Sequence, residues 1–443
     1  MKSTRCSTFN AAVIAMVCIP FLYSCQNCHL ETYESYSYNP IYLNVDSLES
    51  MVKTLPPRDM VRPGGLYYKD GYVYVMELGK EDYSYNYRED GSYVYNLRLH
   101  ETGIHIIDDT NPSTPVPVAF INIPGINGMT AKGDKLYADS FTDLLVFDIS
   151  NPTSPEMSQR VKNVYQNLSY AGIYIDETFG IITGYESIPV TYENEVCDDV
   201  EPPIYYYDDQ MIQESTSSFN AGGSPSAGSS GSMARFVTVG DYLYNIDYSD
   251  LHLFDISGAA PEKVSDIHIG WQVETIYPYE DKLFFGSFDG MYIYDNTNPS
   301  DPTFISKYEH VTSCDPVVVQ GDYAYVTLRS GTTCQGFTNQ LDIVNVSTPE
   351  TPFLEKSYQM DNPHGLSIFG NCLYICEGAF GLKSFNVDAN DPTQIAQIST
   401  QTGMHALDVI ALPNMLMVVG NDGFYQYSRS CGSALEYLGV ISF

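Results

Sequence analysis

Three carboxylates and one imidazole occupy equivalent places in four successive segments of this 443-residue sequence. They are Glu274, Asp315, His364 and Asp408, each a few residues before a polar turn that joins two predicted strands. Groups of this kind that converge on one point can hold a divalent cation such as calcium, or bind a cationic or polar ligand. Crowded carboxylates favour protonation of one another unless a cation lies between them. The four residues are therefore candidate metal ligands.

The same column in the earlier segments also carries residues that could line a binding site. If the alignment is allowed to shift by one residue, this column contains Gly64, Asn127, Tyr170 and Arg235. Together with the first four, these residues would form a ring of ligand or channel-mouth candidates, and His405 would lie near the same mouth. Two alternatives stay open: a water-filled channel with a polar lining, and a hydrolase or lyase that acts on polysaccharide.

Sequence motifs of familiar enzymes are missing. Trp271 is the only tryptophan, so the recurring Trp motifs of quinone-dependent dehydrogenases and sialidases are absent. No G-x-S-x-G segment supplies a serine nucleophile, and no H-x-x-x-H segment supplies a pair of zinc ligands. We therefore nominate no catalytic residue, and the sequence favours a binding module over an enzyme.

Two repeated phrases indicate which elements would gather the ring. The segment LLVFDISNPTSPEM starts at Leu144, and similar segments return along the chain, each reading as a strand, a turn and a strand. A strand, a Gly–Asp turn and a strand precede each of them, as in VVVQGDYAYVTL. Four strands in about 40 residues are typical of a β-propeller blade. One column of the first phrase should close Asx- or Ser-type turns; it holds Asp108, Asp148, Asp255, Asp295, Asn345, Asn386 and Ser428.

We therefore predict an all-β protein in which residues 62–443 form a propeller of four-stranded blades. The count of hairpins favours eight blades with an incomplete third, and seven is the alternative. An acidic and then Ser/Gly-rich loop is expected at 184–233, and its Ser/Gly-rich part at 215–232 should be flexible. An insert at 79–101 reads as a hairpin with alternating tyrosines, among them Tyr87 and Tyr93. Its tyrosine face either packs on the propeller rim or offers an aromatic surface for sugars.

The N-terminus reads as an export signal. Lys2 and Arg5 precede a short apolar run at 11–23, too short for a relaxed membrane span. The run ends in Leu-Tyr-Ser-Cys, which resembles a bacterial lipobox with Cys25 as the lipidated residue. We expect a lipoprotein signal peptide at 1–24 and a tether at 25–61. Ordinary secretion without a lipid is the alternative.

Charge and cysteine content narrow the partners and the compartment. The formal net charge is −34, so a basic stripe for nucleic acid is lacking, and basic partners or cations are favoured. Disulfides are permitted in an exported protein. Cys314 and Cys334 flank a predicted hairpin and should form a bridge. Cys372 and Cys376 are four residues apart on one strand, too far apart to pair with each other.

The repeats resemble the LVIVD-repeat family of exported bacterial proteins. The resemblance rests on LDIV at 341–344, with Asn345 where the family has Asp, on SCDPVVVQGDYAYVTLRSGTTC, and on NPHGL. It implies a β-propeller and often a surface lipoprotein of Bacteroidetes-like bacteria, but no settled activity. The expected protein is an outer-membrane lipoprotein at the cell surface, a binding scaffold with a protein or glycan partner.

Overall fold

The computed structural model describes residues 3–6, 25–78, 84–96, 102–165, 175–176, 179–197, 229–230, 232, 234–247, 249–310, 316–329, 338–429 and 433–443. The chain divides into two compact units. The propeller unit comprises Asn44–Glu81, Arg98–Ile175 and Ile212–Phe443, and the ribbon unit comprises Met1–Leu43, Asp82–Leu97 and Asp176–Met211. The predicted signal peptide lies largely outside the described residues.

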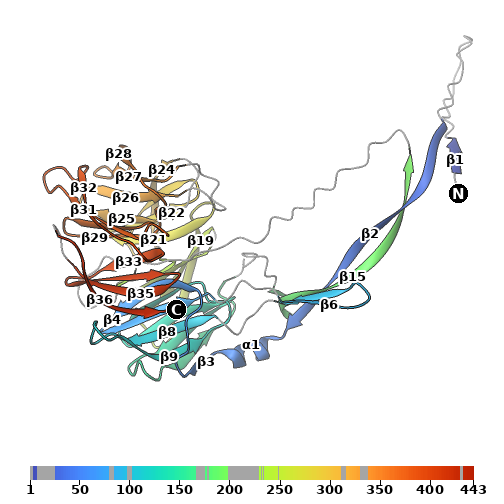
Figure 1. Ribbon diagram of the computed structural model, residues 1–443, viewed down its shortest axis with the longest axis horizontal. Helices are drawn as coiled ribbons and strands as arrows, with labels where there is room; N and C mark the ends of the chain where they lie inside the picture. The colour runs from blue at the N-terminus through green and yellow to red at the C-terminus, as the bar shows by residue number, and fades with distance from the viewer. Residues whose placement is uncertain are drawn as a thin grey trace, which may run out of the picture. The chain divides into compact units, whose positions relative to one another are not determined.

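Seven antiparallel sheets make up the propeller unit (Figure 1). In chain order their strands are β4 (Pro63–Lys69), β5 (Tyr72–Glu77), β8 (Gly103–Asp108) and β9 (Val116–Asn122); β10 (Met129–Lys132), β11 (Lys135–Ser140), β12 (Asp143–Asp148) and β13 (Glu156–Val161); β17 (Phe236–Val239), β18 (Tyr242–Ile246), β19 (Asp250–Asp255) and β20 (Glu262–His268); β21 (Val273–Tyr279), β22 (Lys282–Ser287), β23 (Gly290–Asp295) and β24 (Thr303–Glu309); β25 (Val317–Gln320), β26 (Tyr323–Leu328), β27 (Gln340–Asn345) and β28 (Phe353–Gln359); β29 (Leu366–Phe369), β30 (Cys372–Cys376), β31 (Leu382–Val387) and β32 (Ile395–Gln401); and β33 (Ala406–Ala411), β34 (Met415–Gly420), β35 (Gly423–Ser428) and β36 (Glu436–Ser442). The first sheet gains β16 (Ser229–Ser230) beside β4 and β3 (Lys53–Leu55) beside β9.

The first strands of these sheets form a closed ring. Each contacts the next in the order β4, β10, β17, β21, β25, β29 and β33, and β33 contacts β4 again. Gln426 of the last blade donates a hydrogen bond to Asp109 of the first, which adds a polar contact at the closure. The prediction of an all-β propeller is confirmed.

Eight sheets occur in the described chain, as many as the repeat units counted in the sequence. Seven of them form the ring, and the eighth belongs to the ribbon unit. It contains β14 (Ile175–Asp176) and β15 (Gly180–Cys197), which come from the incomplete third unit. The missing second phrase explains this result, because without it the third unit cannot complete a blade.

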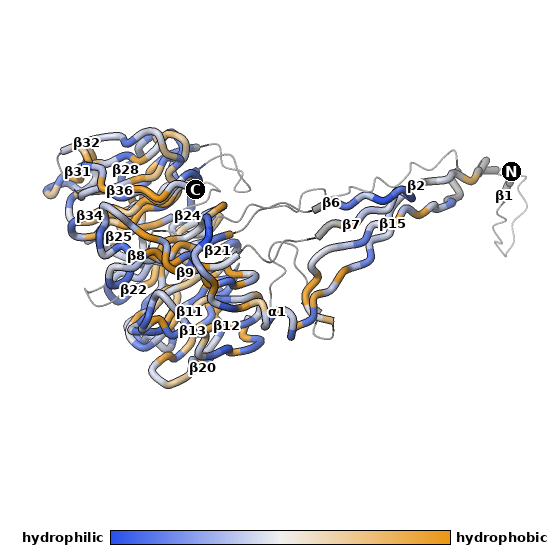
Figure 2. The backbone as a smooth tube through the Cα atoms, turned by 60° about the horizontal axis from the view of Figure 1, so that its bottom comes forward, coloured by the Kyte–Doolittle hydropathy of each residue, from blue (hydrophilic) through white to orange (hydrophobic). Residues whose placement is uncertain are grey.

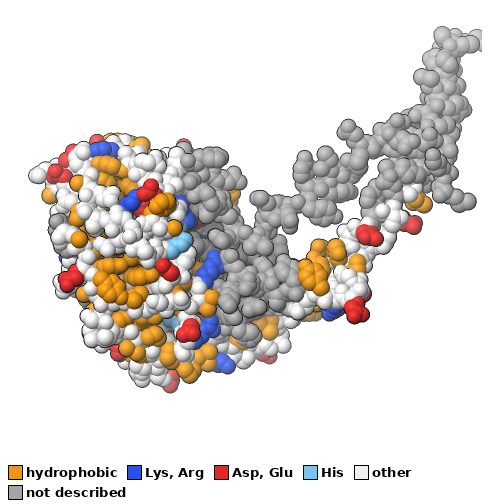
Figure 3. Space-filling view, viewed as in Figure 1, with side chains coloured by type: hydrophobic (Ala, Val, Ile, Leu, Met, Phe, Trp, Pro, Cys, Tyr) orange, Lys and Arg blue, Asp and Glu red, His pale blue; other side chains and the backbone are white. Residues whose placement is uncertain are grey.

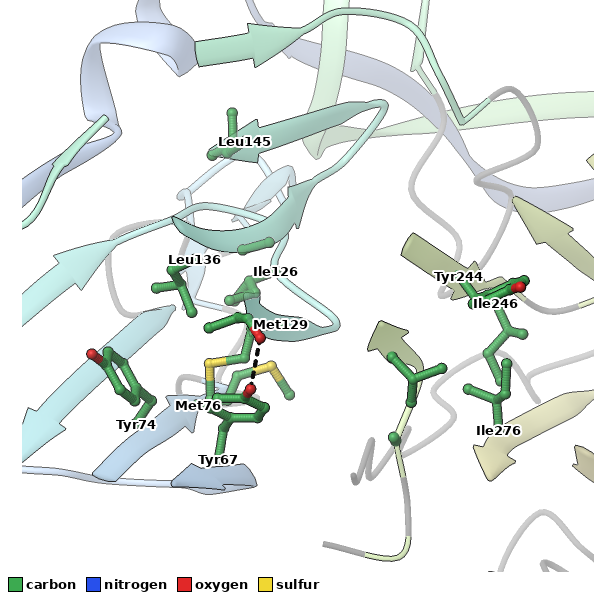
Figure 4. Close-up of a cluster of buried hydrophobic side chains, with 14 of the residues drawn as sticks. Tyr67, Tyr74, Met76, Ile126, Met129, Leu136, Leu145, Tyr244, Ile246 and Ile276 are labelled. Carbon is green, nitrogen blue, oxygen red and sulfur yellow. Dashed lines mark hydrogen bonds between the residues drawn. The ribbon is translucent and has the colours of Figure 1, made fainter. Parts of the chain in front are cut away.

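Large side chains of the second strands fill the spaces between blades. Tyr74, Tyr137, Tyr244, Tyr325 and Tyr374 occupy the same place in five blades and are almost fully buried. The Tyr244 hydroxyl donates to Asn296 in the next blade (2.9 Å) and that of Tyr325 donates to the carbonyl of Pro392 in the next (3.2 Å). Each of these two tyrosines therefore buries its aromatic ring between blades and also gives its hydroxyl a hydrogen-bond acceptor. Figure 4 shows a similar contact, in which the Tyr67 hydroxyl of β4 donates to the carbonyl of Ala131 in β10.

The turn residues behave as the repeat predicts in most blades. Asp148 and Asp295 accept the N–H groups of Ser150 and Thr297, both at 2.8 Å, and Asp108, Asp255 and Asn345 form the same turn. The sixth blade differs, because Asp388 rather than Asn386 accepts an N–H group two residues on. In all seven blades the pairing of third and fourth strands has a register shift just before this turn.

The ribbon unit is a separate antiparallel sheet. Its main path is β1 (Ser3–Cys6), β2 (Cys25–Leu43), β15, β7 (Tyr93–Asn96) and β6 (Ser84–Tyr87), and β14 pairs with β15. The predicted tyrosine hairpin is present as β6 and β7, but β7 extends a sheet with β15. Residues 25–61, expected to be a tether, contain β2, the helix α1 (Val45–Met51) and β3. In the described part of the chain no helix is long and apolar enough to cross a membrane.

Cysteine positions test one prediction and leave another open. Cys372 is disulfide-bonded, whereas Cys376 is a buried free thiol, so the two do not pair with each other. The predicted bridge between Cys314 and Cys334 falls on residues outside the described ranges.

Candidate functional site

The two ends of the propeller carry different kinds of loop. One end has the tight turns between first and second strands and the Asx turns between third and fourth strands. The opposite end, which we call the mouth end, has the loops between second and third strands and the connections between blades. Both long insertions start there: one lies between β5 and β8, and the other between β13 and β17. Variation in chain length is therefore confined to the mouth end.

Buried carboxylates fix the mouth-end connections in three blades. Asp139, at the end of β11, accepts the N–H groups of Asn127 (2.7 Å) and Gly128 (2.8 Å) through one oxygen. Glu77 and Glu377 each lie three residues after the buried tyrosine of the second strand, and Asp139 lies two after Tyr137. Each of the two glutamates also accepts two successive N–H groups, at 2.6 to 2.9 Å. Such charge-assisted bonds satisfy donors that would otherwise be buried without partners. They fix the backbone on which the predicted ring residues stand.

A basic side chain on the third strand balances the mouth-end acid in three blades. The pairs are Glu77 with His105 (3.3 Å), Asp247 with His252 (2.8 Å) and Glu377 with Lys383 (3.1 Å). Burial opposes the charged form of His252, but hydrogen bonds to Asp247 and Asp266 raise its pKa. These acids are therefore engaged in structure. Sequence reasoning missed them because each pair joins residues that no recognised motif links.

The structure brings together only some of the predicted ring. Asn127, Arg235, Glu274, His364 and Asp408 lie at or near the mouth-end start of inner strands, whereas Tyr170 and Asp315 fall outside the described residues. The backbones beside His364 and Asp408 are joined, because Gly365 N–H donates to the carbonyl of Leu407 at 2.9 Å. His405 lies near His364, as expected, with ring centroids 6.4 Å apart.

Metal binding by Glu274, His364 and Asp408 gains no support from the geometry. Within the ranges that the structure describes, no three His, Cys, Asp or Glu side chains are grouped so that they could hold a metal ion. Asp408 instead accepts hydrogen bonds from the N–H group (3.3 Å) and the hydroxyl (3.4 Å) of Ser232. The predicted four-ligand site also includes Asp315, which lies outside those ranges.

His364 is held as a neutral hydrogen-bond acceptor. Its ring is 5% exposed and lies 3.1 Å from Nη1 of Arg329 and 3.2 Å from Nδ2 of Asn362. Burial, followed by the positive charge of Arg329, holds the pKa of His364 well below its usual range. Two donors therefore compete for the lone pair of this imidazole, which leaves a poor general base and a poor metal ligand. Arg329 and Asn362 lie in segments on which the family resemblance rests, but nothing in the sequence indicated that they contact His364.

A short segment of the long insertion pairs with an inner strand. Ser229 and Ser230 form β16, which pairs with the inner strand β4 of the first blade. The Ser232 hydroxyl accepts the N–H group of Leu366 at 2.7 Å and donates to Asp408, so it reaches the sixth and seventh blades. Residues 184–197, expected to begin a loop, belong to β15, and the Ser/Gly-rich part expected to be flexible contains β16. No sequence pattern indicated this, because pairing of β16 with β4 is long-range.

Trp271 is an exposed aromatic residue at the mouth end. It lies in the connection between β20 and β21, is 53% exposed, and contacts Phe288 edge to face with centroids 4.9 Å apart. It stands three residues before Glu274. An exposed tryptophan is a typical anchor for a binding partner. The mouth end therefore offers an aromatic contact, with the half-buried Glu274 three residues away.

Comparison with protein families confirms the resemblance found in the sequence. The model described as the LVIVD repeat matches residues 130–163 and 313–360. The chain contains LVIVD repeats. Each matched range covers one blade of the ring, β10 to β13 and β25 to β28, so here the LVIVD repeat corresponds to a blade. The comparison with curated proteins finds no match.

Several solved structures are similar in overall fold. BamB from Moraxella catarrhalis has 11% identity and a TM-score of 0.46 over 92% of this chain and 99% of its own. The periplasmic gluconolactonase PpgL of Pseudomonas aeruginosa has 10% identity and a TM-score of 0.49, over 86% and 95%. A protein from Lactobacillus plantarum has 13% identity and a TM-score of 0.49, over 80% and 99%. No function is transferred from them.

Proposed function

We propose that this LVIVD-repeat protein is an exported, lipid-anchored propeller that serves as a non-enzymatic binding scaffold. The observation that carries the proposal is the mouth end, where the exposed ring of Trp271 and the half-buried Glu274, three residues further on, stand at the start of β21. The opposite end consists of short, internally bonded turns. A ligand therefore finds polar and aromatic contacts at the mouth end.

The state of His364 favours binding over catalysis. A hydrolase or lyase at this ring would need a group that exchanges a proton near neutral pH. His364 is neutral and engaged by Arg329 and Asn362. The half-buried Arg329 brings a positive charge to the mouth, and the half-buried Glu274 brings a negative charge. A polar segment of a partner protein fits this mixture better than an isolated cation does, and a basic partner also suits the acidic chain.

The proposed address is the outer membrane, at the cell surface. It rests on the basic start, the short apolar run and the Leu-Tyr-Ser-Cys segment that ends at Cys25. Labelling with radioactive palmitate tests it: the wild-type chain should incorporate label and sediment with outer membranes, and Cys25→Ala should do neither. Unchanged labelling of Cys25→Ala would contradict the anchor. Protease digestion of whole cells then tests surface exposure.

Binding at the mouth end can be measured with the protein's own tryptophan. Because Trp271 is the only one, its fluorescence reports on this end alone. The mature chain is titrated with a library of Lys-rich peptides and, separately, with calcium chloride. We expect a saturable change with peptides and a roughly tenfold weaker affinity in Glu274→Ala, since one good charged contact contributes about 1.4 kcal/mol. The proposal fails if no peptide changes the signal, or if Glu274→Ala binds like the exposed control Glu350→Ala.

A further inference from the structure

The ribbon unit gathers tyrosines on one face of its sheet. The registers of β2 with β15, β15 with β7 and β7 with β6 place Tyr38, Ser187, Tyr93 and Tyr87 in one row across four strands. Tyr36 lies two residues from Tyr38 and therefore on the same face. We call Tyr36, Tyr38, Tyr87 and Tyr93 the tyrosine platform. The next row across the sheet reads Pro40, Tyr185, Tyr95 and Tyr85 in backbone register.

Contacts among the platform residues fix the rings while leaving them open. The centroid of Tyr93 is 5.7 Å from that of Tyr36 and 5.4 Å from that of Tyr87. A hydrogen bond with Tyr93 is the main cause that raises the pKa of Tyr38. Ser187, between them in the row, is completely buried, and the exposed fractions of Tyr87, Tyr38 and Tyr36 are 76%, 54% and 44%. Figure 3 shows exposed hydrophobic side chains, a class that includes tyrosine, on the described part of this sheet.

The platform carries no charged side chain among the described residues. Glu34 is the nearest acid in β2 on the same face, two residues beyond Tyr36. Glu186 lies on the opposite face of the sheet and forms an ion pair with Arg88. An anionic ligand would therefore meet no cation here, and a cationic one would meet no carboxylate within the platform. The surface suits a neutral ligand.

The composition of the face also distinguishes ligand classes. Tyr, Ser and Pro make up the described part of the platform rows, and no Leu, Ile, Val or Met stands among them. A protein partner is usually met by aromatics together with Met and Arg around an apolar core. Phenol rings instead offer flat apolar faces with a hydroxyl at the edge. Sugars have the complementary arrangement, apolar C–H faces bordered by hydroxyl groups.

We propose that the tyrosine platform binds a neutral polysaccharide. Sugar rings would stack on Tyr87, Tyr38 and Tyr36, and their hydroxyl groups would exchange hydrogen bonds with the phenols. The platform belongs to the ribbon unit, whereas the binding function proposed above belongs to the mouth end of the propeller. The two sites are therefore independent.

The test is affinity electrophoresis of the mature chain in gels that contain a soluble neutral polysaccharide. Mixed-linkage β-glucan, galactomannan and α-mannan serve as probes, with polygalacturonate as the anionic control. We expect retardation by at least one neutral probe and none by polygalacturonate. Tyr87→Ala should weaken binding about fivefold, because one lost aromatic contact is worth roughly 1 kcal/mol, and Tyr87→Phe should retain most of it. Tyr87 is largely exposed, so its removal should not unfold the sheet.

Two further variants separate this site from its alternatives. Tyr192 is 52% exposed but has the opposite parity on β15, so Tyr192→Ala should bind like the wild type. Trp271→Ala removes the aromatic contact at the mouth end and should also leave polysaccharide binding unchanged. The proposal is overturned if no neutral probe retards the protein, if Tyr87→Ala and Tyr192→Ala weaken binding equally, or if polygalacturonate or a Lys-rich peptide binds the platform instead.

Discussion

The propeller unit and the ribbon unit are both antiparallel β-structure, but they stabilise their strands in opposite ways. Within the described residues, all five clusters of buried hydrophobic side chains belong to the propeller unit. Figure 2 shows apolar stretches of the tube concentrated in the strands of that unit. The ribbon instead exposes large side chains, among them Leu30, Tyr36 and Tyr192. A sheet without a buried face is marginally stable in water, so the ribbon depends on its cross-strand pairs.

This difference separates scaffold from surface. The propeller places aromatic rings between blades, where they contribute to stability through burial and are unavailable to a ligand. The ribbon places the same residue type in solvent, where it contributes less to stability and is accessible. The 38 tyrosines of the chain therefore serve two purposes that composition alone does not distinguish. Substitutions in the two units should have correspondingly different effects.

The largest expected effect follows removal of a buried ring from the propeller. Phe147 of β12 is completely buried within the largest cluster. Phe147→Ala should lower the free energy of unfolding by about 3 to 5 kcal/mol, because a cavity replaces the ring. Denaturant unfolding followed by near-ultraviolet circular dichroism measures the change. Tyr192→Ala in the ribbon should leave this transition unchanged, and equal effects of the two variants would contradict the division into a packed and an open unit.

The next effect concerns the buried acids of the mouth end. Glu377 is completely buried, accepts the N–H groups of Asp361 and Asn362, and pairs with Lys383. Glu377→Ala leaves these donors without their acceptor and should cost about 3 kcal/mol. The exposed acid Glu350 provides the control, since Glu350→Ala should change stability by less than about 0.5 kcal/mol. A small effect of Glu377→Ala would show that water replaces the carboxylate.

The sequence predicts the ring of blades because its repeat specifies the same two hairpins in nearly every unit. The Asx column and the Gly–Asp turns specify hairpins from adjacent residues, and Asp148 and Asp295 form the predicted turns. The number of units was also readable. The sequence does not indicate which units enter the ring of blades. The third unit lacks the second repeated phrase, and its strand β15 pairs with β2 instead. The pairing of Gly180–Cys197 with Cys25–Leu43 joins segments more than 130 residues apart.

The candidate site was predictable only in outline. Alignment on the turns places His364 and Asp408 side by side, since equivalent positions of adjacent blades meet at the inner strands. It cannot indicate that Arg329 and Asn362 engage His364, or that Ser232 bonds to Asp408, because these contacts do not follow from the repeated turns. The acids Glu77 and Glu377 were also overlooked. They occupy the same position in their two blades, but their partners are backbone N–H groups, which a sequence pattern does not reveal.

A pH titration can test whether burial governs the charge of the mouth-end acids. Burial raises the pKa of Asp139 to about 6 from its ordinary 3.8. The folded state then binds the proton more tightly than the unfolded state, so this contribution is complete below pH 3.8 and is lost as pH rises through 6. About two pKa units correspond to roughly 3 kcal/mol. Asp139→Asn keeps the acceptor oxygen and should remove this dependence.

The measurement is the free energy of unfolding of wild type and Asp139→Asn between pH 4 and pH 7. The free energy of unfolding of Asp139→Asn, relative to that of the wild type, should increase as pH rises to 6 and stay constant above it. A difference that is constant with pH would show that the N–H groups of Asn127 and Gly128 offset the cost of burying the charge. The ribbon should not contribute, because its described acids are not fully buried.

The smallest expected effect belongs to the exposed turns that repeat around the propeller. The hydroxyl and N–H groups of Thr297 hold the pKa of Asp295 below its ordinary value. A lowered pKa in the folded state means that the stabilisation is present above pH 3.8 and is lost as pH falls through the folded pKa. Asp295→Ala should therefore lower Tm slightly at pH 7 and by less in acid, below the folded-state pKa, whereas Asp295→Asn should retain most of the turn. Turns of this kind occur in five of the seven blades. An effect of Asp295→Ala as large as that of Phe147→Ala would contradict the comparison, since the turns rather than the packed blades would then determine the stability of the propeller.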